Sequence, residues 1–103
     1  MKYQRTPQFD SDVRRLSAEE FEKFSKLARE EFSPACDRYA ADPATKWPTR
    51  LRVKPVAGTP GVLEMTWSFA GPDGRATFEL VTVEGELQIR WRRVGRHAIF
   101  RRP

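Results

Sequence analysis

The chain has 103 residues and a formal net charge of +5, with 39% hydrophobic and 32% charged residues. This length allows one domain with a modest core, so we expect a single domain over residues 1–103. Seven Phe, three Trp and two Tyr exclude an intrinsically disordered chain, because such chains lack large apolar groups. There is no apolar run of the roughly 20 residues that a membrane helix needs, no secretory signal at the start, and one cysteine. We therefore expect a cytoplasmic protein without a membrane association or an internal disulfide.

The charge is distributed unevenly along the chain. Residues 1–42 carry eight Lys and Arg against nine Asp and Glu, whereas residues 43–103 carry eleven against five. A basic half beside a near-neutral half indicates a surface that attracts phosphates and a part that is mostly scaffold. A solvated surface that only aids solubility would give the same totals, so the placement of the charges must decide.

The first 42 residues have helical periodicity. Residues 2–5 could form a short edge strand, and a short helix is expected from about Pro7 to Leu16. Ser17 and Glu20 have the spacing of a capping box at the start of a second helix. The apolar stripe of that helix consists of Phe21, Phe24, Leu27, Ala28 and Phe32. Ser33-Pro34 either kinks this helix or begins a new one, since proline favours the first helical turn.

After Pro48 the apolar residues recur with a period of two. Alternation is found in residues 50–54, 63–69, 75–80 and 87–92, and the segments between them are rich in Gly and Pro. Each alternating segment predicts a half-buried strand. The sequence therefore predicts an α+β fold, with N-terminal helices packed on one face of a twisted antiparallel sheet of about four strands.

If the helices cover the apolar face of this sheet, the opposite face collects cations. These are Arg50, Arg52, Lys54, Arg75, Arg90 and Arg92. Only Glu64 and Glu79 are expected among them. An exposed sheet face must be polar in any case, and long arginine side chains cover it well. The preference for arginine over a mixture of signs nevertheless favours phosphate binding, because the planar guanidinium matches phosphate oxygens.

Several segments together resemble a known family. They are Thr6–Phe9, Asp12–Leu16, Gly58–Trp67, Gly74–Phe78 and Trp91–Phe100, and the pattern that they form resembles the RelE/ParE toxin superfamily. Its most specific parts are Gly74-Arg75 at the start of one strand and Gly95-Arg96-His97 at the end of the last. The resemblance implies a compact α+β domain. RelE-like members are messenger-RNA endonucleases that act in the ribosomal decoding site and are neutralised by a cognate antitoxin, whereas ParE-like members poison DNA gyrase.

The resemblance also implies roles for three residues. Arg75 lies where the family has a phosphate-contacting arginine, His97 where several ribonuclease members have a histidine, and Phe100 near a C-terminal aromatic. The sequence departs from the family at residues 63–68, which lack the lysine pair of the best-known RelE-type proteins, and His97 is its one histidine.

These residues can be assigned to the steps of metal-independent RNA cleavage. The reaction needs a base for the 2′-hydroxyl, an acid for the leaving 5′-oxygen, and cations around the phosphorane. We expect His97 to be the general acid, since nearby arginines lower the pKa of a histidine. Arg75 would clamp the phosphate, and Lys54 would add charge. No general base is identified, with Glu79 and a desolvated Lys54 as candidates.

The remaining candidates are expected to bind RNA rather than to transfer protons. They are Arg50, Arg52, Arg90, Arg92, Arg96 and Phe100. Phe100 could stack on a base, although an aromatic at such a place more often pins a tail to the core. The alternative to a functional role for His97 is that it is a surface histidine without a partner. No spacing indicates a metal site or a cofactor.

The leading hypothesis is a RelE-like toxin that cleaves messenger RNA on the ribosome and is neutralised by a cognate antitoxin. Two alternatives remain open at this stage. One is a noncatalytic member of the same fold that binds RNA or a protein, and the other is a ParE-like toxin directed at gyrase.

Overall fold

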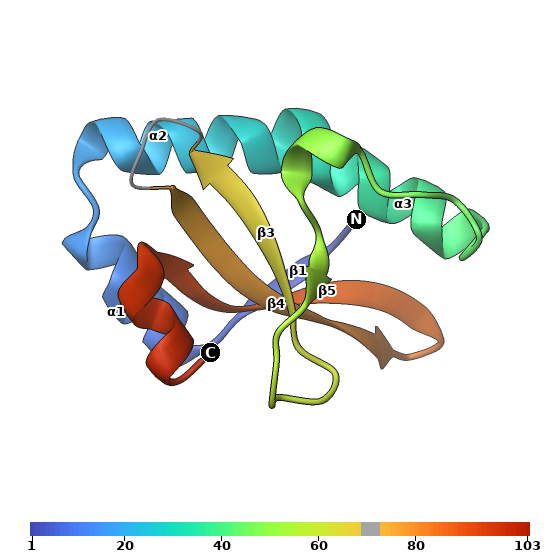
Figure 1. Cartoon of the computed structure of the whole chain (residues 1–103). Coiled ribbons are helices and arrows are strands. Elements are labelled where there is room, and N and C mark those ends of the chain that lie inside the picture. Colours follow the sequence, from blue (N-terminus) through green and yellow to red (C-terminus); the bar gives the residue numbers. More distant parts are fainter. Residues whose placement is uncertain (69–72) are drawn as a thin grey trace.

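A computed structural model describes residues 1–68 and 73–103, apart from the side chain of His97. The first half consists of β1 (Tyr3–Arg5), α1 (Pro7–Arg15), α2 (Ala18–Leu27), a π-helical turn η1 (Ala28–Phe32) and α3 (Ser33–Ala41). The second half consists of a 3-10 turn η2 (Thr49–Leu51), β2 (Lys54–Pro55), β3 (Leu63–Ser68), β4 (Gly74–Val83), β5 (Glu86–Gly95) and a 3-10 helix η3 (His97–Arg101). In Figure 1 the run from α2 to α3 crosses one face of the sheet, while α1 and η3 lie together at one end of it.

Local side-chain contacts explain where the helices begin. The hydroxyl of Thr6 accepts a hydrogen bond from Phe9 N at 3.2 Å and caps α1. The predicted capping box of α2 is confirmed, because Glu20 N donates to Ser17 Oγ at 3.1 Å and Ser17 N donates to Glu20 Oε1 at 2.9 Å. Each contact satisfies an amide that the helix leaves without a partner.

The structure settles what happens at Ser33-Pro34. Helical conformation continues from Ala18 to Ala41, and the turn from Ala28 to Phe32 widens to a π-helix. Pro34 has no amide hydrogen, so the helix could not pass it with a regular hydrogen-bonding ladder. The wide turn before the proline accommodates that loss without ending the helix.

The sheet confirms the expected fold class and adds one strand to it. The strand order is β1-β5-β4-β3-β2, and helices cover one face. Three of the pairings are antiparallel, whereas β1 runs parallel to β5 in the register Tyr3 to Ile89 and Arg5 to Trp91. The sheet is therefore mixed and has five strands rather than about four antiparallel ones. The additional strand is β1, which lies in the segment of residues 2–5 that the sequence analysis gave as a possible short edge strand.

The strand expected over residues 50–54 is present only from Lys54, and the expectation is wrong for residues 50–53. Thr49–Leu51 form a 3-10 turn, Arg52 has a left-handed backbone with φ 49°, and only Lys54–Pro55 pair with β3. Leu51 is nevertheless fully buried, as the alternation predicted. Burial every second residue over five positions does not distinguish a strand from a tight turn, and the flanking prolines favour the turn.

A β-bulge decides which side chains of β5 face the helices. Thr77 pairs with Arg93 and Phe78 pairs with Trp91, so Arg92 is the extra residue. Trp91 and Val94 therefore both enter the core, at 5% and 1% exposure. The aromatic part of this core consists of Phe9, Phe24, Phe32, Trp67, Phe78 and Trp91.

Candidate functional site

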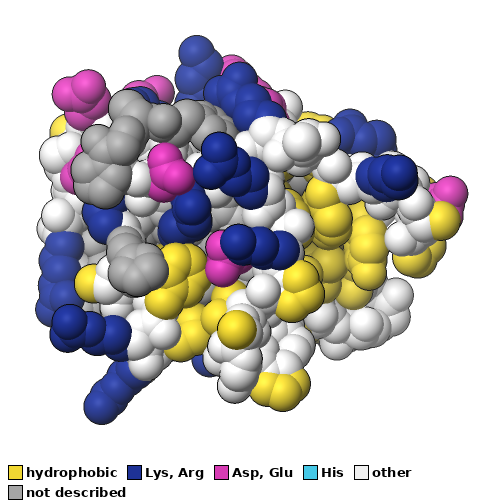
Figure 2. Space-filling model, in the orientation of Figure 1, with side chains coloured by type: hydrophobic (Ala, Val, Ile, Leu, Met, Phe, Trp, Pro, Cys, Tyr) yellow, Lys and Arg dark blue, Asp and Glu magenta, His cyan; other side chains and the backbone are white. Residues whose placement is uncertain are grey.

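The candidate site lies on the sheet face turned away from α2 and α3, which we call the far face. Ala76 and Phe78 of β4 are fully buried in the core, so their neighbours Arg75, Thr77 and Glu79 point to the far face. On the side of the molecule seen in Figure 2, basic side chains are spread over the surface and acidic side chains lie among them. The far face is a set of ion pairs, in which Asp73 joins the two acids, Glu64 and Glu79, that alternation placed among the cations.

Arg75 is the least exposed cation of this face. Its side chain is only 18% exposed, its Nη2 donates to Asp73 Oδ2 at 3.2 Å, and its Nε lies 3.8 Å from Glu64 Oε1. Two carboxylates thus hold the guanidinium in one orientation. The remaining nitrogen, Nη1, is buried and has no hydrogen-bond partner among the described residues.

Two further cations share the same carboxylates. Lys54 Nζ lies 3.8 Å from Glu64 Oε1, and Arg52 Nη1 lies 3.3 Å from Asp73 Oδ2. Both side chains are well exposed, at 65% and 60%. Lys54, Arg52 and Arg75 therefore form one cluster with two acids, and the two outer cations can turn toward a ligand at little cost because they are solvated.

A second polar atom near Arg75 also lacks a partner. Thr66 is opposite Arg75 in the β3–β4 register, it is 1% exposed, and its Oγ1 has no hydrogen bond. Buried polar groups without partners are rare in folded proteins and call for an explanation, often a bound water or ion. Here a donor nitrogen and a hydroxyl without partners occupy opposed positions on one face. They form the strongest structural indication of a small-anion position.

The close contact between Gly74 and Trp67 fixes the start of β4. A Cβ on Gly74 would lie 2.5 Å from the Trp67 ring, and Trp67 Nε1 donates to the carbonyl oxygen of Arg75 at 2.8 Å. Only glycine allows the indole to approach this closely. The glycine of the Gly74-Arg75 pair is therefore required for packing against Trp67, and this packing positions Arg75.

Arg90 and Arg92 lie farther along the far face and share one acid. Arg92 Nη1 is hydrogen-bonded to Glu79, and Arg90 Nη1 lies 3.9 Å from the same carboxylate. Glu79 was a candidate general base. In this structure two guanidinium groups engage the Glu79 carboxylate and occupy its oxygens.

The C-terminal segment covers part of the far face. Pro103 O accepts hydrogen bonds from Thr77 Oγ1 at 2.9 Å and from Arg92 Nε at 3.0 Å, and Arg102 O accepts from Arg93 Nη1 at 3.0 Å. Ile99 of η3 is 4% exposed and so ties this segment to the core. Ile99 rather than the half-buried Phe100 is the residue that pins the tail.

Two of the predicted RNA-binding arginines lie elsewhere. Arg50 leaves the expected row of cations because of the 3-10 turn, and its Nη2 lies 3.8 Å from Glu31 of η1. Arg96 Nη2 is 2.9 Å from Glu20 Oε2 and its guanidinium lies 5.1 Å from the centre of the Trp67 ring. This ion pair and the Ser17 amide lower the pKa of Glu20, the hydrogen bond from the amide being the larger cause. Neither arginine joins Arg75 on the far face.

His97 begins η3, directly after β5, but its side chain lies outside the described part of the structure. The expectations for Phe69 and for the turn at Gly71-Pro72 also lie outside the described residues. The backbone places His97 two residues beyond Gly95, which pairs with Arg75. The proton-transfer role of His97 remains a prediction.

Other kinds of site find no support in the described residues. Across residues 1–68 and 73–103 there is no group of three or more His, Cys, Asp or Glu side chains that could hold a metal ion. Burial raises the pKa of the Cys36 thiol to about 12, so it stays protonated and is a poor nucleophile. In the same part of the chain, no helix has the length and apolarity to span a membrane.

The sequence analysis missed three participants of the far face. Asp73 bridges Arg52 and Arg75, Thr66 contributes a hydroxyl without a partner, and Thr77 binds the tail. Asp73 was detectable, since an acid directly before Gly74-Arg75 is within reach of the arginine. Thr66 and Thr77 carry no sequence signal, because every exposed strand face contains such residues.

Comparison with known proteins supports the fold. No family model matches the chain, and no curated protein matches its sequence. Among solved structures, the chain is similar to one in the crystal structure of the intact E. coli RelBE toxin-antitoxin complex. The TM-score is 0.50 with 9% sequence identity, over 92% of this chain and 94% of that chain. The protein has a RelE-like toxin fold, as the resemblance predicted, and at this identity the likeness concerns the fold alone.

Proposed function

We propose that this protein is the toxin of a toxin–antitoxin pair, a RelE-like endoribonuclease that cleaves messenger RNA on the ribosome in the cytoplasm. A cognate antitoxin protein would neutralise it. The observation that supports this most strongly is the Arg75 site, where a held guanidinium has a buried nitrogen without a partner opposite the equally unpartnered hydroxyl of Thr66. The RelE-like fold of the chain is consistent with the same function.

The proposed reaction begins with attack of the 2′-hydroxyl on the adjacent phosphorus. The guanidinium of Arg75 binds a nonbridging oxygen of the scissile phosphate, and Lys54 and Arg52 turn from their carboxylates to neutralise the charge that develops. His97 donates a proton to the leaving 5′-oxygen, which leaves a cyclic 2′,3′-phosphate on the other fragment. The base that accepts the 2′-hydroxyl proton is not assigned.

The rest of the far face would hold the RNA strand. Arg90 and Arg92 lie along β5, and RNA phosphates would compete with Glu79 for them. Phe100 and Arg96 flank His97 in the chain and are proposed to contact the nucleotides beside the cleavage site. Arg50 lies beside η1, so its proposed contact with RNA would lie away from the Arg75 site.

The test is to map messenger-RNA ends on translating ribosomes after expression of variant chains. His97→Ala should lower cleavage about 100-fold or more, as loss of a general acid does. Arg75→Lys keeps a positive charge between Glu64 and Asp73 but removes the planar fork, and should lower cleavage about tenfold or more. The matched control is Arg14→Lys on the exposed side of α1, which should leave cleavage unchanged.

The possible results separate three functions. Cleavage that persists in both His97→Ala and Arg75→Lys would remove these residues from the mechanism. RNA binding without cleavage by the unaltered chain would favour the noncatalytic alternative. The ion pairs of the far face are also compatible with a surface that binds RNA without cleaving it. DNA damage that depends on gyrase, without ribosomal cleavage, would instead favour a ParE-like activity.

A further inference from the structure

The inner side of the Arg75 guanidinium needs a partner that RNA cannot supply. Nη1 of Arg75 is buried and has no hydrogen-bond partner among the described residues. An RNA phosphate can reach only the exposed atoms of this side chain, which is 18% exposed in all, and Nη1 is not one of them. Buried polar groups without a partner are rare, so this nitrogen requires a partner of its own.

Strand pairing brings a second buried group to the same place. Thr66 is directly opposite Arg75 in the β3–β4 register, and its Oγ1 also has no partner among the described residues. Opposed residues on one face of an antiparallel pair have Cβ atoms about 4.5–5.5 Å apart. The Arg75 side chain bends over β3, since its Nε lies 3.8 Å from Glu64, the next far-face residue of that strand. The guanidinium thus lies over the strand that carries Thr66, yet the two side chains are not hydrogen-bonded to each other.

The carboxylate of Glu64 makes this position unsuitable for an anion. Glu64 is 8% exposed, and its Oε1 lies 3.8 Å from both Lys54 Nζ and Arg75 Nε, which is too long for a hydrogen bond. An anion between Arg75 Nη1 and Thr66 would be buried beside this carboxylate, and a buried charge is costly unless it is fully paired. A water is neutral, and it can accept from Nη1 while it donates to oxygens of Thr66 and Glu64. Buried waters typically make about three such hydrogen bonds.

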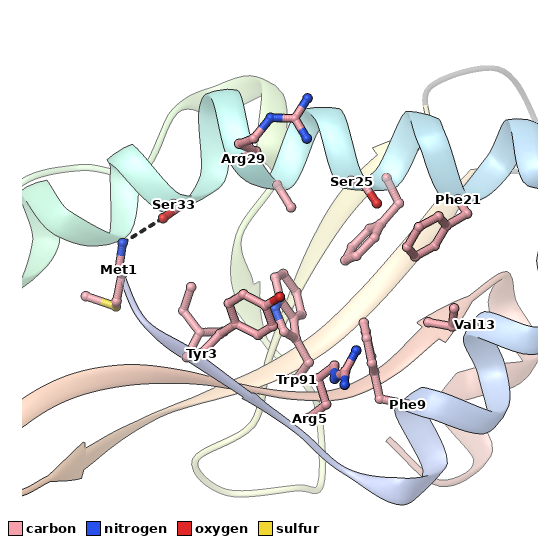
Figure 3. Close-up of a pocket in the computed structure, with 13 residues that line it drawn as sticks. Met1, Tyr3, Arg5, Phe9, Val13, Phe21, Ser25, Arg29, Ser33 and Trp91 are labelled. Carbon is pink, nitrogen blue, oxygen red and sulfur yellow. Dashed lines mark hydrogen bonds between the residues drawn. The ribbon is translucent and has the colours of Figure 1, made fainter.

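The apolar groove at the β1 edge of the sheet is a separate feature. Figure 3 shows it on the helix-covered side of the sheet, between β1 and the run from α2 to η1, and its volume is about 360 Å³. Phe9, Phe21 and Trp91 are among the residues that line it, whereas Arg75, Thr66 and Glu64 are not. The polar position at Arg75 is therefore on the other face of the sheet and is independent of this groove.

We propose that one buried water bridges Arg75 Nη1 and Thr66 Oγ1, and that Thr66 is thereby the positioning residue of Arg75. The guanidinium is then held at Nε by Glu64, at Nη2 by Asp73 and at Nη1 by the bridging water. Its plane is fixed before RNA binds, so that no reorientation is needed when charge develops on the phosphate. The inference rests on the proposed function in one respect, namely that Arg75 binds the scissile phosphate.

NMR of the full chain without RNA tests the bridging water. The unaltered chain should give nuclear Overhauser cross peaks between Thr66 and a long-bound water, and resolved, slowly exchanging resonances for the Nη1 protons of Arg75. Thr66→Val replaces the hydroxyl by a methyl group of similar size, so the water cross peaks should be lost and the Arg75 resonances should broaden. Thr66→Ser keeps the hydroxyl and should restore both signals.

Inorganic phosphate distinguishes a water from an anion at the same position. Phosphate added to the unaltered chain should leave the water cross peaks of Thr66 unchanged, because the water lies on the buried side of the guanidinium. Loss of these cross peaks as phosphate is added would assign the position to an anion and overturn the proposal.

Messenger-RNA cleavage on translating ribosomes tests whether Thr66 acts through Arg75. Thr66→Val should lower cleavage about tenfold, because a misplaced binding group slows the reaction even when it is present, and Thr66→Ser should stay within about twofold of the unaltered chain. In an Arg75→Lys background, Thr66→Val should have no further effect, since the group that it positions is gone. The matched control is Thr82→Val, the same change at an exposed position of β4, which should leave cleavage unchanged.

The outcomes are distinct from those that test the proposed function. A missing water cross peak at Thr66 in the unaltered chain, or an effect of Thr66→Val that persists undiminished in the Arg75→Lys background, would overturn the proposal. Urea unfolding checks that the variants stay folded, and if Thr66→Val does not, the water cross peak of the unaltered chain decides. Because the NMR experiment involves no RNA, a chain that shows the bridging water but does not cleave RNA would retain the bridge and reject the proposed activity.

Discussion

The contact between Asp12 and Arg93 joins α1 to the bulged end of β5, and its removal should destabilise the protein strongly. Asp12 is 7% exposed at its side chain and accepts hydrogen bonds from Arg93 Nε at 2.7 Å, Arg93 Nη2 at 3.1 Å and Val94 N at 3.1 Å. The same hydrogen bonds raise the pKa of Arg93. Asp12→Ala leaves the guanidinium and a buried amide without these acceptors.

The expected loss in the free energy of unfolding follows from the two groups that Asp12→Ala leaves without an acceptor, the Arg93 guanidinium and the Val94 amide. Removing one partner of a buried ion pair costs about 3–5 kcal/mol, and an unsatisfied buried amide costs about 1–3 kcal/mol. Arg93 is 20% exposed and Arg102 O still accepts from its Nη1, so water and this carbonyl recover part of the loss. We expect about 3 kcal/mol, which is a large fraction of the roughly 5–15 kcal/mol of a domain this size.

Urea unfolding of a double-mutant cycle provides the measurement. Asp12→Ala, Arg93→Met and the double variant are compared with the unaltered chain, and the coupling energy should be about 1–3 kcal/mol. The control is Asp10→Ala on the same helix, whose ion pair with Arg5 is 43% and 57% exposed and should contribute less than about 1 kcal/mol. A loss below about 1 kcal/mol for Asp12→Ala, or strict additivity in the cycle, would refute the reasoning.

Two further predictions concern the start of β4 and the start of α2. Gly74→Ala places a Cβ 2.5 Å from the Trp67 ring, so overpacking should lower the free energy of unfolding in urea by about 1–3 kcal/mol. It should also displace the hydrogen bond of Trp67 Nε1, which would shift the NMR resonance of the indole N–H. An unchanged resonance would contradict this prediction. Glu20 has a lowered pKa in the folded chain, so its carboxylate stabilises the fold at pH above the ordinary value of 4.5, and this contribution is lost as pH falls through the lowered pKa. Glu20→Gln should therefore be less stable than the unaltered chain by up to about 1 kcal/mol near neutral pH, because the ion pair with Arg96 is part-exposed. This difference should shrink as pH falls through the lowered pKa of Glu20, and a difference independent of pH would argue against a role of the charge.

The sequence by itself determined the features that depend on near neighbours. The Ser17 and Glu20 spacing identified the start of α2 because a capping box involves four consecutive residues. Alternation identified β3, β4 and β5 and their core side chains, since burial of one sheet face imposes a period of two. The family resemblance, rather than periodicity, singled out Arg75, which is the least exposed cation of the candidate site.

Only the tertiary structure decided how distant segments meet. The parallel pairing of β1 with β5 joins residues more than eighty positions apart, and the bulge at Arg92 depends on its partner strand. The same holds for the ion pairs of the far face, where Glu64 and Glu79 reach cations on neighbouring strands and Asp73 reaches Arg52 beyond η2. Charge counts along a chain do not reveal such pairs, because an ion pair forms by proximity in space. The far face is consequently a surface of paired charges, on which Nη1 of Arg75 has no hydrogen-bond partner among the described residues.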